Sequence, residues 1–334
     1  FSFKKYRAMK FRKILITGGA GYVGAVLVPR LLADDYCVTV YDLMIYGESA
    51  LPKHPNLTVV KGDIRDQKLL KKSMLDQDAV IHLACISNDP SFELNPALGR
   101  SINLDAFQPL VEISRNQGVK RFIYASSSSV YGIKKEMDVN EVMTLEPLTD
   151  YSRFKAECEK ILLDYQSPSF STVIVRPATV CGYSPRQRLD VIVNILTNLA
   201  YNKREISIFG GEQLRPNIHI ADMVDSYLLL LESDDLAVSG QIFNAGFENQ
   251  KVKDLAEIVK EVIGQDVRMV TLPTEDNRSY HISSKKIYDE LGFKASRTIR
   301  DAVIDIKKAF DQGKLPNSLN DERYFNIKRM QSLN

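Results

Sequence analysis

A tyrosine and a lysine four positions apart, Tyr151 and Lys155, are the residues best suited to proton transfer. They stand at the start of a segment with helical spacing, so both side chains are expected on one helix face. A phenol with a pKa of about 10 is a poor base at neutral pH, but a neighbouring ammonium favours the phenolate. Such a pair can take a proton from a hydroxyl group and return it. On spacing alone, an exposed pair on a helix surface is the alternative.

Four consecutive serines, Ser126 to Ser129, precede this pair at the end of an expected strand. A serine hydroxyl near Tyr151 can donate a hydrogen bond to the same substrate oxygen. The cluster therefore completes a possible set of groups for chemistry at a hydroxyl or carbonyl carbon.

A glycine-rich turn between the first expected strand and the first expected helix has the form of a dinucleotide site. It contains Gly18, Gly21 and Gly24 in one register, or starts at Gly19 in another. Glycines permit a tight turn and close approach of the backbone to a diphosphate, and the helix N-terminus supplies N–H donors. The cofactor-binding residues expected here are Gly18, Gly21, Tyr22, Val23 and Gly24.

Asp42 ends the second expected strand, where a carboxylate can accept hydrogen bonds from the adenosine ribose. The same carboxylate would repel the 2′-phosphate of NADP, so the sequence predicts NAD. Further contacts are expected after the third and fourth strands, because ligands bind at the carboxyl ends of such strands. The residues concerned are Asp63, Ile64, Leu83 and Ala84, with a helix N-cap as the alternative role for Asp63. His82 is expected to be a packed core histidine.

Short apolar strands alternate with helical segments over the first half of the chain. This pattern predicts a doubly wound α/β fold, a parallel sheet covered by helices on both faces. The expected strands are 13–17, 37–41, 57–61, 79–83, 122–126 and 172–175, and the expected helices are 23–33, 67–76, 98–116 and 151–165. Pro109 should kink or divide the third helix.

The second half predicts a smaller C-terminal α/β domain for the substrate. A Rossmann domain is assigned to 10–176 and is expected to be completed by about 217–246, where 241–245 returns to the sheet. The substrate domain is assigned to 177–216 and 247–315, and a polar tail to 316–334. A ligand cleft is expected between the two domains.

Composition narrows the classes of function. The 334 residues include 44 basic and 42 acidic side chains, for a net charge of +2, which gives no broad basic face for nucleic acid. Apolar runs are too short to span a membrane. The four cysteines are far apart, which indicates thiols in the cytoplasm rather than disulfides or a metal site. Met9 is a candidate natural start of the chain.

The glycine turn, Asp42, the serine cluster and Tyr151 with Lys155 occur in an order that resembles the extended short-chain dehydrogenase/reductase family of nucleotide-sugar epimerases and dehydratases. The resemblance runs from about Lys13 to at least Ile299. It implies that Tyr151 is the catalytic acid and base, that Lys155 orients it and holds the nicotinamide ribose, and that Ser127 is the catalytic hydroxyl. Ser127 and Ser128 are also expected to contact substrate.

The resemblance extends to arginine-bearing segments of the second half. The segment 176–182 resembles an RPxxVYG motif, with Cys181 in place of tyrosine and Thr179 where many sugar epimerases have asparagine. Arg215 matches an arginine that binds the substrate diphosphate, and Arg278 lies where a second one is expected. Two guanidinium groups suit one diphosphate, because their planar donors match phosphate oxygens.

The stretch 184–190 resembles a subgroup that includes dehydrogenases of nucleotide-linked heptoses. Arg186 and Arg188 are expected in the sugar or phosphate pocket, with a solvated basic loop as the alternative. His219 is expected to be structural and to fix the turn that presents Arg215. No partner can be named for His54 or His281.

These features favour an NAD-dependent nucleotide-sugar epimerase that acts through a transient 4-keto sugar. A nucleotide-sugar C4 dehydrogenase or ketosugar reductase, with a heptose as one candidate sugar, is the alternative, because its catalytic groups would be the same. Dehydratases of this kind carry Asp-Glu where this chain has Ser128 and Ser129, which weakens a 4,6-dehydratase. A silent NAD-binding sensor would lack Tyr151, Lys155 or the serines. The resemblance also implies a homodimer, with helices 98–116 and 151–165 of two copies forming a four-helix bundle.

Overall fold

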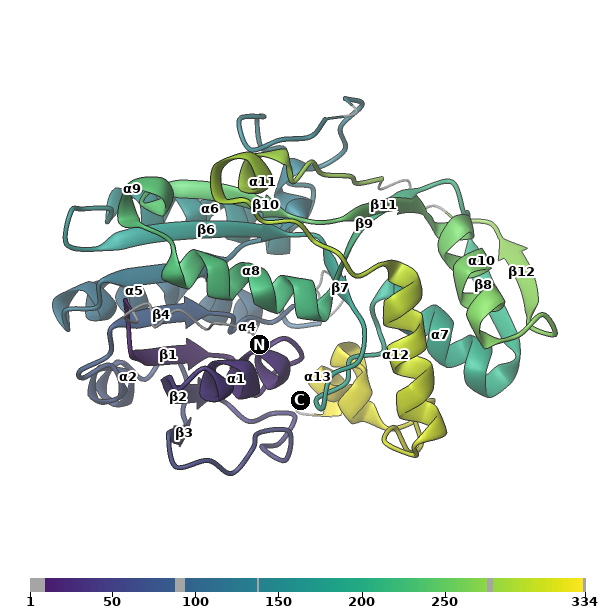
Figure 1. Cartoon of the computed structure of the whole chain (residues 1–334), viewed down its shortest axis with the longest axis horizontal. Helices are drawn as coiled ribbons and strands as arrows, with labels where there is room; N and C mark the ends of the chain where they lie inside the picture. Colours follow the sequence, from purple (N-terminus) through teal and green to yellow (C-terminus); the bar gives the residue numbers. More distant parts are fainter. Residues whose placement is uncertain (1–9, 88–93, 137, 275–278, 333–334) are drawn as a thin grey trace, which may run out of the picture.

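Seven parallel strands form the central sheet of the computed structural model, which describes residues 10–87, 94–136, 138–274 and 279–332 (Figure 1). The strand order is β10-β6-β5-β4-β1-β2-β3. Their apolar, β-branched runs are buried because helices cover both faces. The strands are β1 (Lys13–Thr17), β2 (Cys37–Asp42), β3 (Leu57–Lys61), β4 (Ala79–His82), β5 (Arg121–Ala125), β6 (Ser171–Pro177) and β10 (Gln241–Ala245). The expected return of 241–245 to the sheet is confirmed, since β10 pairs in parallel with β6.

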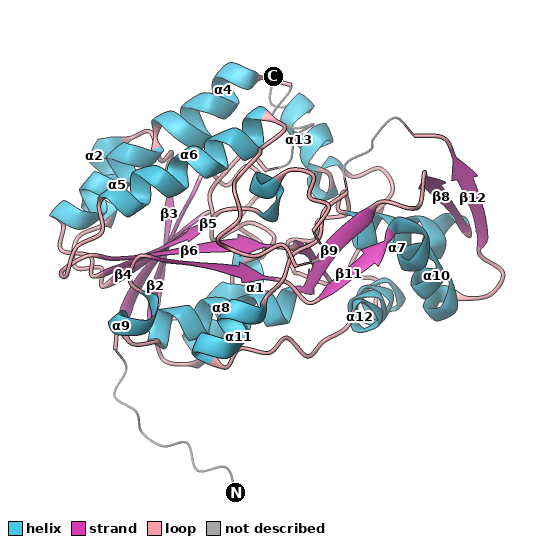
Figure 2. Ribbon diagram, turned by 90° about the horizontal axis from the view of Figure 1, so that it is seen from above, coloured by secondary structure: helices cyan, strands magenta, loops and turns pink. Residues whose placement is uncertain are grey.

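Helices lie on both faces of this sheet, as Figure 2 shows from above. One face carries α2 (Gln67–Ser73), α4 (Pro96–Arg100), α5 (Phe107–Asn116) and α6 (Asp150–Asp164). The other face carries α1 (Gly24–Ala33), α8 (Ile220–Glu232), α9 (Asp235–Val238) and α11 (Lys285–Leu291). A separate hydrophobic core fills each side. The predicted doubly wound α/β fold is therefore confirmed.

The helix expected over 98–116 is divided into three pieces. A π-helical turn, η1 (Ser101–Asp105), separates α4 from α5. Pro109 lies in the first turn of α5, where its missing N–H would have had no partner inside the helix. The chain therefore changes helical form before the proline rather than at it.

A smaller lobe lies beyond the carboxyl ends of the sheet strands. It holds a three-stranded sheet of order β11-β9-β7 and a parallel pair, β12 with β8. Its elements are β7 (Thr179–Cys181), α7 (Ile192–Lys203), β8 (Glu205–Phe209), β9 (Leu214–His219), β11 (Glu248–Lys251), α10 (Val252–Ile263), β12 (Arg268–Leu272) and α12 (Ile299–Asp311). The three helices and β8 enclose a third hydrophobic core.

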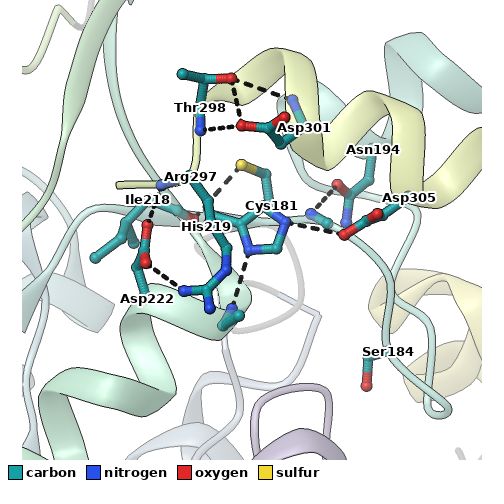
Figure 3. A network of polar contacts seen from close by, with 12 residues as sticks. Cys181, Ser184, Asn194, Ile218, His219, Asp222, Arg297, Thr298, Asp301 and Asp305 are labelled. Atoms are coloured by element: carbon teal, nitrogen blue, oxygen red, sulfur yellow. Dashed lines mark hydrogen bonds and ion pairs between the residues drawn. The ribbon is translucent and has the colours of Figure 1, made fainter. Parts of the chain in front are cut away.

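A polar network ties α12 of the lobe to α8 of the main sheet (Figure 3). The buried Asp222 carboxylate accepts hydrogen bonds from the backbone N–H groups of Ser296 and Arg297 and from the Arg297 guanidinium. His219 caps α8 by accepting from the Ala221 N–H at Nδ1, and its Nε2 lies 3.2 Å from the Asp305 carboxylate. His219 is thus structural, as expected, but its contacts fix the junction of α8 and α12.

The segment expected to be a polar tail contains more structure than its composition suggests. It includes a 3-10 turn, η3 (Glu322–Tyr324), and α13 (Asn326–Ser332). Asn326 and Met330 are buried, and Arg329 Nε donates to the Ile45 carbonyl after β2. The C-terminal end of the chain therefore packs against the loop that follows β2 instead of only lying on the surface.

No helix among the described residues is sufficiently long and apolar to cross a membrane.

Candidate active site

A cavity of about 710 Å³ opens at the carboxyl ends of the sheet strands, between the main sheet and the smaller lobe. Most predicted site residues lie on its wall. They are Gly18, Gly21, Tyr22, Val23, Gly24, Asp42, Ile64, Leu83, Ala84, Ser127, Ser128, Tyr151, Lys155, Thr179, Arg186, Arg188 and Arg215. Residues from distant parts of the sequence thus converge on one concave site, as a ligand pocket requires.

One predicted residue among those described, Asp63, does not line the cavity. The Asp63 carboxylate pairs with Arg65, whose Nε donates a hydrogen bond to Asp63 Oδ1 at 2.9 Å. This pairing lowers the pKa of Asp63. Its neighbours Gly62 and Ile64 line the cavity instead. Arg278 lies outside the described residues.

The glycine turn leaves space that a larger side chain would fill. Gly18 has a φ of 73°, and a Cβ there would lie 2.6 Å from the Ala84 backbone nitrogen. A Cβ at Gly24 would lie 2.3 Å from the Gly19 carbonyl oxygen. Gly18, Gly21 and Gly24 all line the cavity, so the register that starts at Gly18 describes the turn. Because these glycines have no side chains, the backbone of the turn is accessible to a cofactor diphosphate, which must approach it closely.

The start of α1 and Asp42 complete the fit to NAD. Among the described residues no side chain caps the N-terminus of α1, and Val23 and Gly24 at its start line the cavity. The positive end of the helix dipole therefore lies at the cavity wall. The Asp42 carboxylate accepts from the N–H groups of Ala20 (3.0 Å) and Met44 (2.8 Å). Burial raises the pKa of Asp42, and these two hydrogen bonds oppose that shift. The carboxylate is held at the strand end, the position where ribose hydroxyls bind in this type of fold.

Tyr22, inside the glycine turn, joins the turn to the smaller lobe. Its hydroxyl donates to the Gly182 carbonyl at 2.7 Å and accepts from Asn194 Nδ2. Its own carbonyl accepts from the Ser184 hydroxyl at 2.7 Å. The loop after β7 is therefore fastened directly to the turn that would hold the cofactor.

The helix α6 positions the tyrosine and lysine. It begins with a capping box in which Thr149 and Ser152 satisfy each other's backbone N–H groups. Lys155 is 5% exposed, donates from Nζ to the Ala125 carbonyl at 2.7 Å and lies 5.8 Å from the centre of the Tyr151 ring. The predicted pair therefore shares one helix face, with the ammonium buried beside the more accessible phenol.

The serines after β5 have different surroundings. The Ser127 hydroxyl accepts from the Ser129 N–H at 3.1 Å and lies 2.8 Å from the Ser129 hydroxyl, at the start of the turn η2 (Ser128–Tyr131). Ser126 instead donates to the buried Glu159 carboxylate. Ser127 is thus held at the cavity wall, whereas the Ser126 hydroxyl is occupied inside the protein.

A buried ion pair lies behind the serine turn and α6, on the side away from the cavity. Arg176 and Glu159 are each 3% exposed and form two hydrogen bonds, of 2.6 and 3.0 Å. Arg176 also donates to the Tyr131 hydroxyl, which donates to Asn244 of β10. This network links α6, η2, β6 and β10 behind the catalytic candidates, so it holds the serine turn and α6 in a fixed relation.

The far end of the cavity belongs to the smaller lobe. Thr179 of β7 and Arg215 of β9 both line it, and the Arg215 guanidinium lies 5.7 Å from the centre of the Tyr280 ring. Arg188 forms a 2.6 Å ion pair with Asp190 on the same loop. This end combines guanidinium groups with an aromatic face, which suits a phosphorylated ligand with a flat ring.

Several wall residues had no signal in the sequence. They include Tyr46, Tyr280, Asn326, Ile327 and Met330. Tyr46 and the three residues of α13 come from segments without a recognisable motif, and only the fold brings them to the cavity. Neither unassigned histidine reaches the cavity wall: His54 accepts from the Asn56 N–H, and His281 contacts the Glu136 carbonyl.

Comparisons with known proteins agree with this arrangement. The sequence model described as "NAD dependent epimerase/dehydratase family" matches residues 14–246, more than half of the chain. A UDP-glucose 4-epimerase of Lactobacillus helveticus is 27% identical over 313 residues, which cover 87% of this chain and 94% of that protein.

Solved structures give the same result. The UDP-glucose 4-epimerase of Thermotoga maritima with UDP-glucose superposes with a TM-score of 0.81 at 26% identity, covering 90% of this chain and 99% of that one. The UDP-N-acetylglucosamine 4-epimerase of Methanobrevibacter ruminantium, in complex with UDP-N-acetylmuramic acid, has the same TM-score at 28% identity, with the same two shares covered.

Proposed function

Because the chain belongs to the NAD-dependent epimerase/dehydratase family, we propose that it inverts the hydroxyl at C4 of a nucleotide-sugar through a transient 4-keto intermediate. The observation that carries this proposal is the single cavity that joins the glycine turn, the Tyr151 and Lys155 pair, and Arg215. A cofactor at one end and an anionic substrate at the other would meet at Tyr151.

The proposed chemistry divides between the cofactor and three side chains. When bound, NAD accepts the hydride of C4 and returns it to the opposite face of the sugar. Tyr151, as phenolate, takes the proton of the C4 hydroxyl and later gives it back. The buried Lys155 ammonium favours that phenolate, and the Ser127 hydroxyl donates to the same substrate oxygen.

The substrate is proposed to lie toward the smaller lobe. Arg215 would bind the diphosphate, with Arg278 as a second arginine, while Thr179 and Ser128 face the sugar side. Residues 10–176 and 217–246 would then form the cofactor unit, joined by α11, which packs on the main sheet. Residues 177–216 and the rest of 247–315 would form the nucleotide-sugar unit. The two solved relatives are named for UDP-sugars, so a UDP-linked hexose is the first substrate to test.

Two further proposals concern the surroundings of the enzyme. A homodimer is proposed, with α5 and α6 of two copies in a four-helix bundle, because these helices lie side by side on one face of the sheet. A cytoplasmic location is proposed, because all four cysteines are free thiols and two of them are fully enclosed.

The test follows product and cofactor together. Purified protein with NAD is incubated with UDP-glucose, UDP-galactose and their N-acetylated and C6-oxidised relatives. NMR identifies the sugar products, and absorbance at 340 nm reports NADH. Epimerase activity would give the C4 epimer without net NADH, whereas accumulation of NADH with a keto sugar would identify a dehydrogenase.

The variant Tyr151→Phe should lower the turnover rate by a factor of about 10² to 10⁴, because it removes the proton-transferring group. NAD binding, measured by calorimetry, should change little. Tyr288→Phe, at an exposed tyrosine away from the cavity, is the matched control and should keep full activity. Normal turnover by Tyr151→Phe would refute the assignment.

A further inference from the structure

Arg186 comes from the smaller lobe but lies on the cofactor side of the cavity. It belongs to the loop between β7 and α7, is 6% exposed and lines the cavity wall. Its guanidinium carbon stacks 3.5 Å from the centre of the Tyr46 ring. Tyr46 follows β2, only four residues after Asp42, so this side chain from the second half reaches the loop of the adenosine site.

The C-terminal helix holds Arg186 in this position. The Nη2 atom of Arg186 donates a hydrogen bond to Asn326 Oδ1, in α13, at 2.8 Å. Asn326 is fixed in turn, because its backbone N–H donates to Asp190 at 2.7 Å and its side-chain amide donates to the Ser87 hydroxyl at 2.7 Å. The guanidinium is therefore arranged before any ligand binds.

No carboxylate pairs with this buried cation among the described residues. Asp190 is engaged by Arg188, and Arg186 Nε is buried without a hydrogen-bond partner. Burial lowers the pKa of Arg186 to about 10, the direction expected for a positive charge without full neutralisation. Asp42 is among the groups whose charge acts on Arg186, and its two oxygens already accept backbone N–H groups.

We propose that Arg186 binds the diphosphate of NAD, as the cationic partner of the glycine turn and the N-terminus of α1. The diphosphate is the anionic part of NAD, and a planar guanidinium with a free donor suits its oxygens. Arg186 shares the cavity with Gly21 and Gly24, and Asp42 marks the adjacent ribose site. This assignment differs from the sugar-side role expected from the sequence, and it does not depend on which sugar is epimerised.

The proposal explains why the second half of the chain reaches back to the cofactor. Arg186 and Tyr22 both fasten the loop after β7 to the dinucleotide side, Tyr22 from the turn and Arg186 from the loop. Removing Asn326 should therefore weaken NAD binding less than removing Arg186, because it loosens the guanidinium without removing its charge.

The test measures binding to cofactor-free protein by calorimetry at fixed salt, with NAD, ADP-ribose, NADP and UDP as ligands, and with adenosine by ligand-observed NMR. Arg186→Gln should weaken NAD and ADP-ribose binding roughly 10- to 100-fold. Adenosine binding should be unchanged, because adenosine has no diphosphate. Arg186→Lys should recover part of the loss, and Asn326→Ala should show a smaller one.

The control is Arg268→Gln, at an exposed arginine of β12 that pairs with Glu205, and it should bind NAD normally. Thermal unfolding without ligand checks that each variant folds. Three outcomes would overturn the proposal: equal losses for adenosine and NAD, a loss confined to NADP, and a loss for UDP with normal NAD binding. They would assign Arg186 to packing, to a 2′-phosphate and to the substrate, respectively.

Discussion

His82 ends β4 close to the cavity, yet its ring is not available for acid–base chemistry near neutral pH. Burial, together with the nearby charge of Lys155, lowers its pKa to about 3. Its Nδ1 lies 2.6 Å from the Thr17 hydroxyl, and its ring stacks on Tyr124 with 5.7 Å between ring centres. The expectation of a packed core histidine is therefore confirmed, and the ring is neutral in the folded protein.

This neutral histidine should make the fold sensitive to acid. Its unfolded pKa is about 6.5, above the folded value, so below that pH the unfolded chain binds a proton that the folded chain excludes. Stability should fall with decreasing pH between about 6.5 and 3, by up to about 1.4 kcal/mol per unit. Urea unfolding of wild type and His82→Gln at pH 7 and 5 measures this, and wild type should lose about 2 kcal/mol more than the variant. If wild type and His82→Gln lost the same free energy of unfolding between pH 7 and 5, His82 would not be the group that makes the fold sensitive to acid.

The sequence predicted those site residues whose positions follow from a local pattern, such as helical spacing or the end of a strand. Tyr151 and Lys155 share a helix face by their spacing, and Asp42 ends a strand. Arg186 was expected in the sugar or phosphate pocket, and it does line the cavity. Its place beside Tyr46 depends on a hydrogen bond to Asn326. Asn326 lies 140 positions away in the chain, and no local pattern reports such a contact.

Strands were easier to predict than helix ends. The bounds of β1, β3 and β10 agree with those expected, since buried parallel strands are short apolar runs between turns. The single helix expected over 98–116 became α4, η1 and α5, because a π-helical turn has no distinctive sequence pattern. The helix α13 was missed because its seven residues include only two apolar side chains, Ile327 and Met330.

The turn between β1 and α1 should lose its geometry if its last glycine, Gly24, is replaced by any residue with a side chain. In Gly24→Ala the new Cβ would meet the Gly19 carbonyl oxygen at 2.3 Å, so the turn must shift where the diphosphate is proposed to bind. We expect NAD affinity to fall at least about tenfold, the loss of about one charge-assisted hydrogen bond. Calorimetry with NAD measures the effect.

Gly118→Ala is the matched control for that change. Gly118 has a φ of 82° with open space around it, so alanine there should cost only about 1 kcal/mol of stability through backbone strain. Its NAD affinity should remain that of wild type. Equal affinities for the two variants would mean that the glycine turn does not hold the cofactor.

At the scale of the whole molecule, the chain passes repeatedly between the main sheet and the smaller lobe. After β9 it returns through α8 and β10, leaves at β11, returns at α11 and leaves again at α12. It ends with α13, which lines the cavity. Because of these crossings, residues of the main sheet and of the smaller lobe line the same cavity. Neither part is a continuous segment, which agrees with the discontinuous ranges expected from the sequence, although the return of α11 to the main sheet was not expected.

The face that carries α5 and α6 offers the clearest test of assembly. Ile161 and Phe154 on α6 are only partly buried, and Arg100 and Arg115 lie over the rings of Phe154 and Tyr165. Partly covered apolar groups framed by charged side chains are typical of a surface that a second copy covers. In the proposed four-helix bundle, this face would meet its equivalent around a two-fold axis.

If that bundle forms, Ile161→Arg should convert the dimer to a monomer, because each two-fold interface would receive two buried charges. Analytical ultracentrifugation between about 1 and 50 μM measures the change, and a circular dichroism spectrum like that of wild type would show that the monomer is folded. Lys160→Ala, at the exposed neighbour of Ile161, is the control and should remain dimeric. The glycine turn, Asp42 and Lys155 line a cavity formed by one chain, so the folded monomer should keep NAD binding. A wild-type protein that sediments as a monomer throughout this range would exclude the bundle, and a dimeric Ile161→Arg would move the interface to another face.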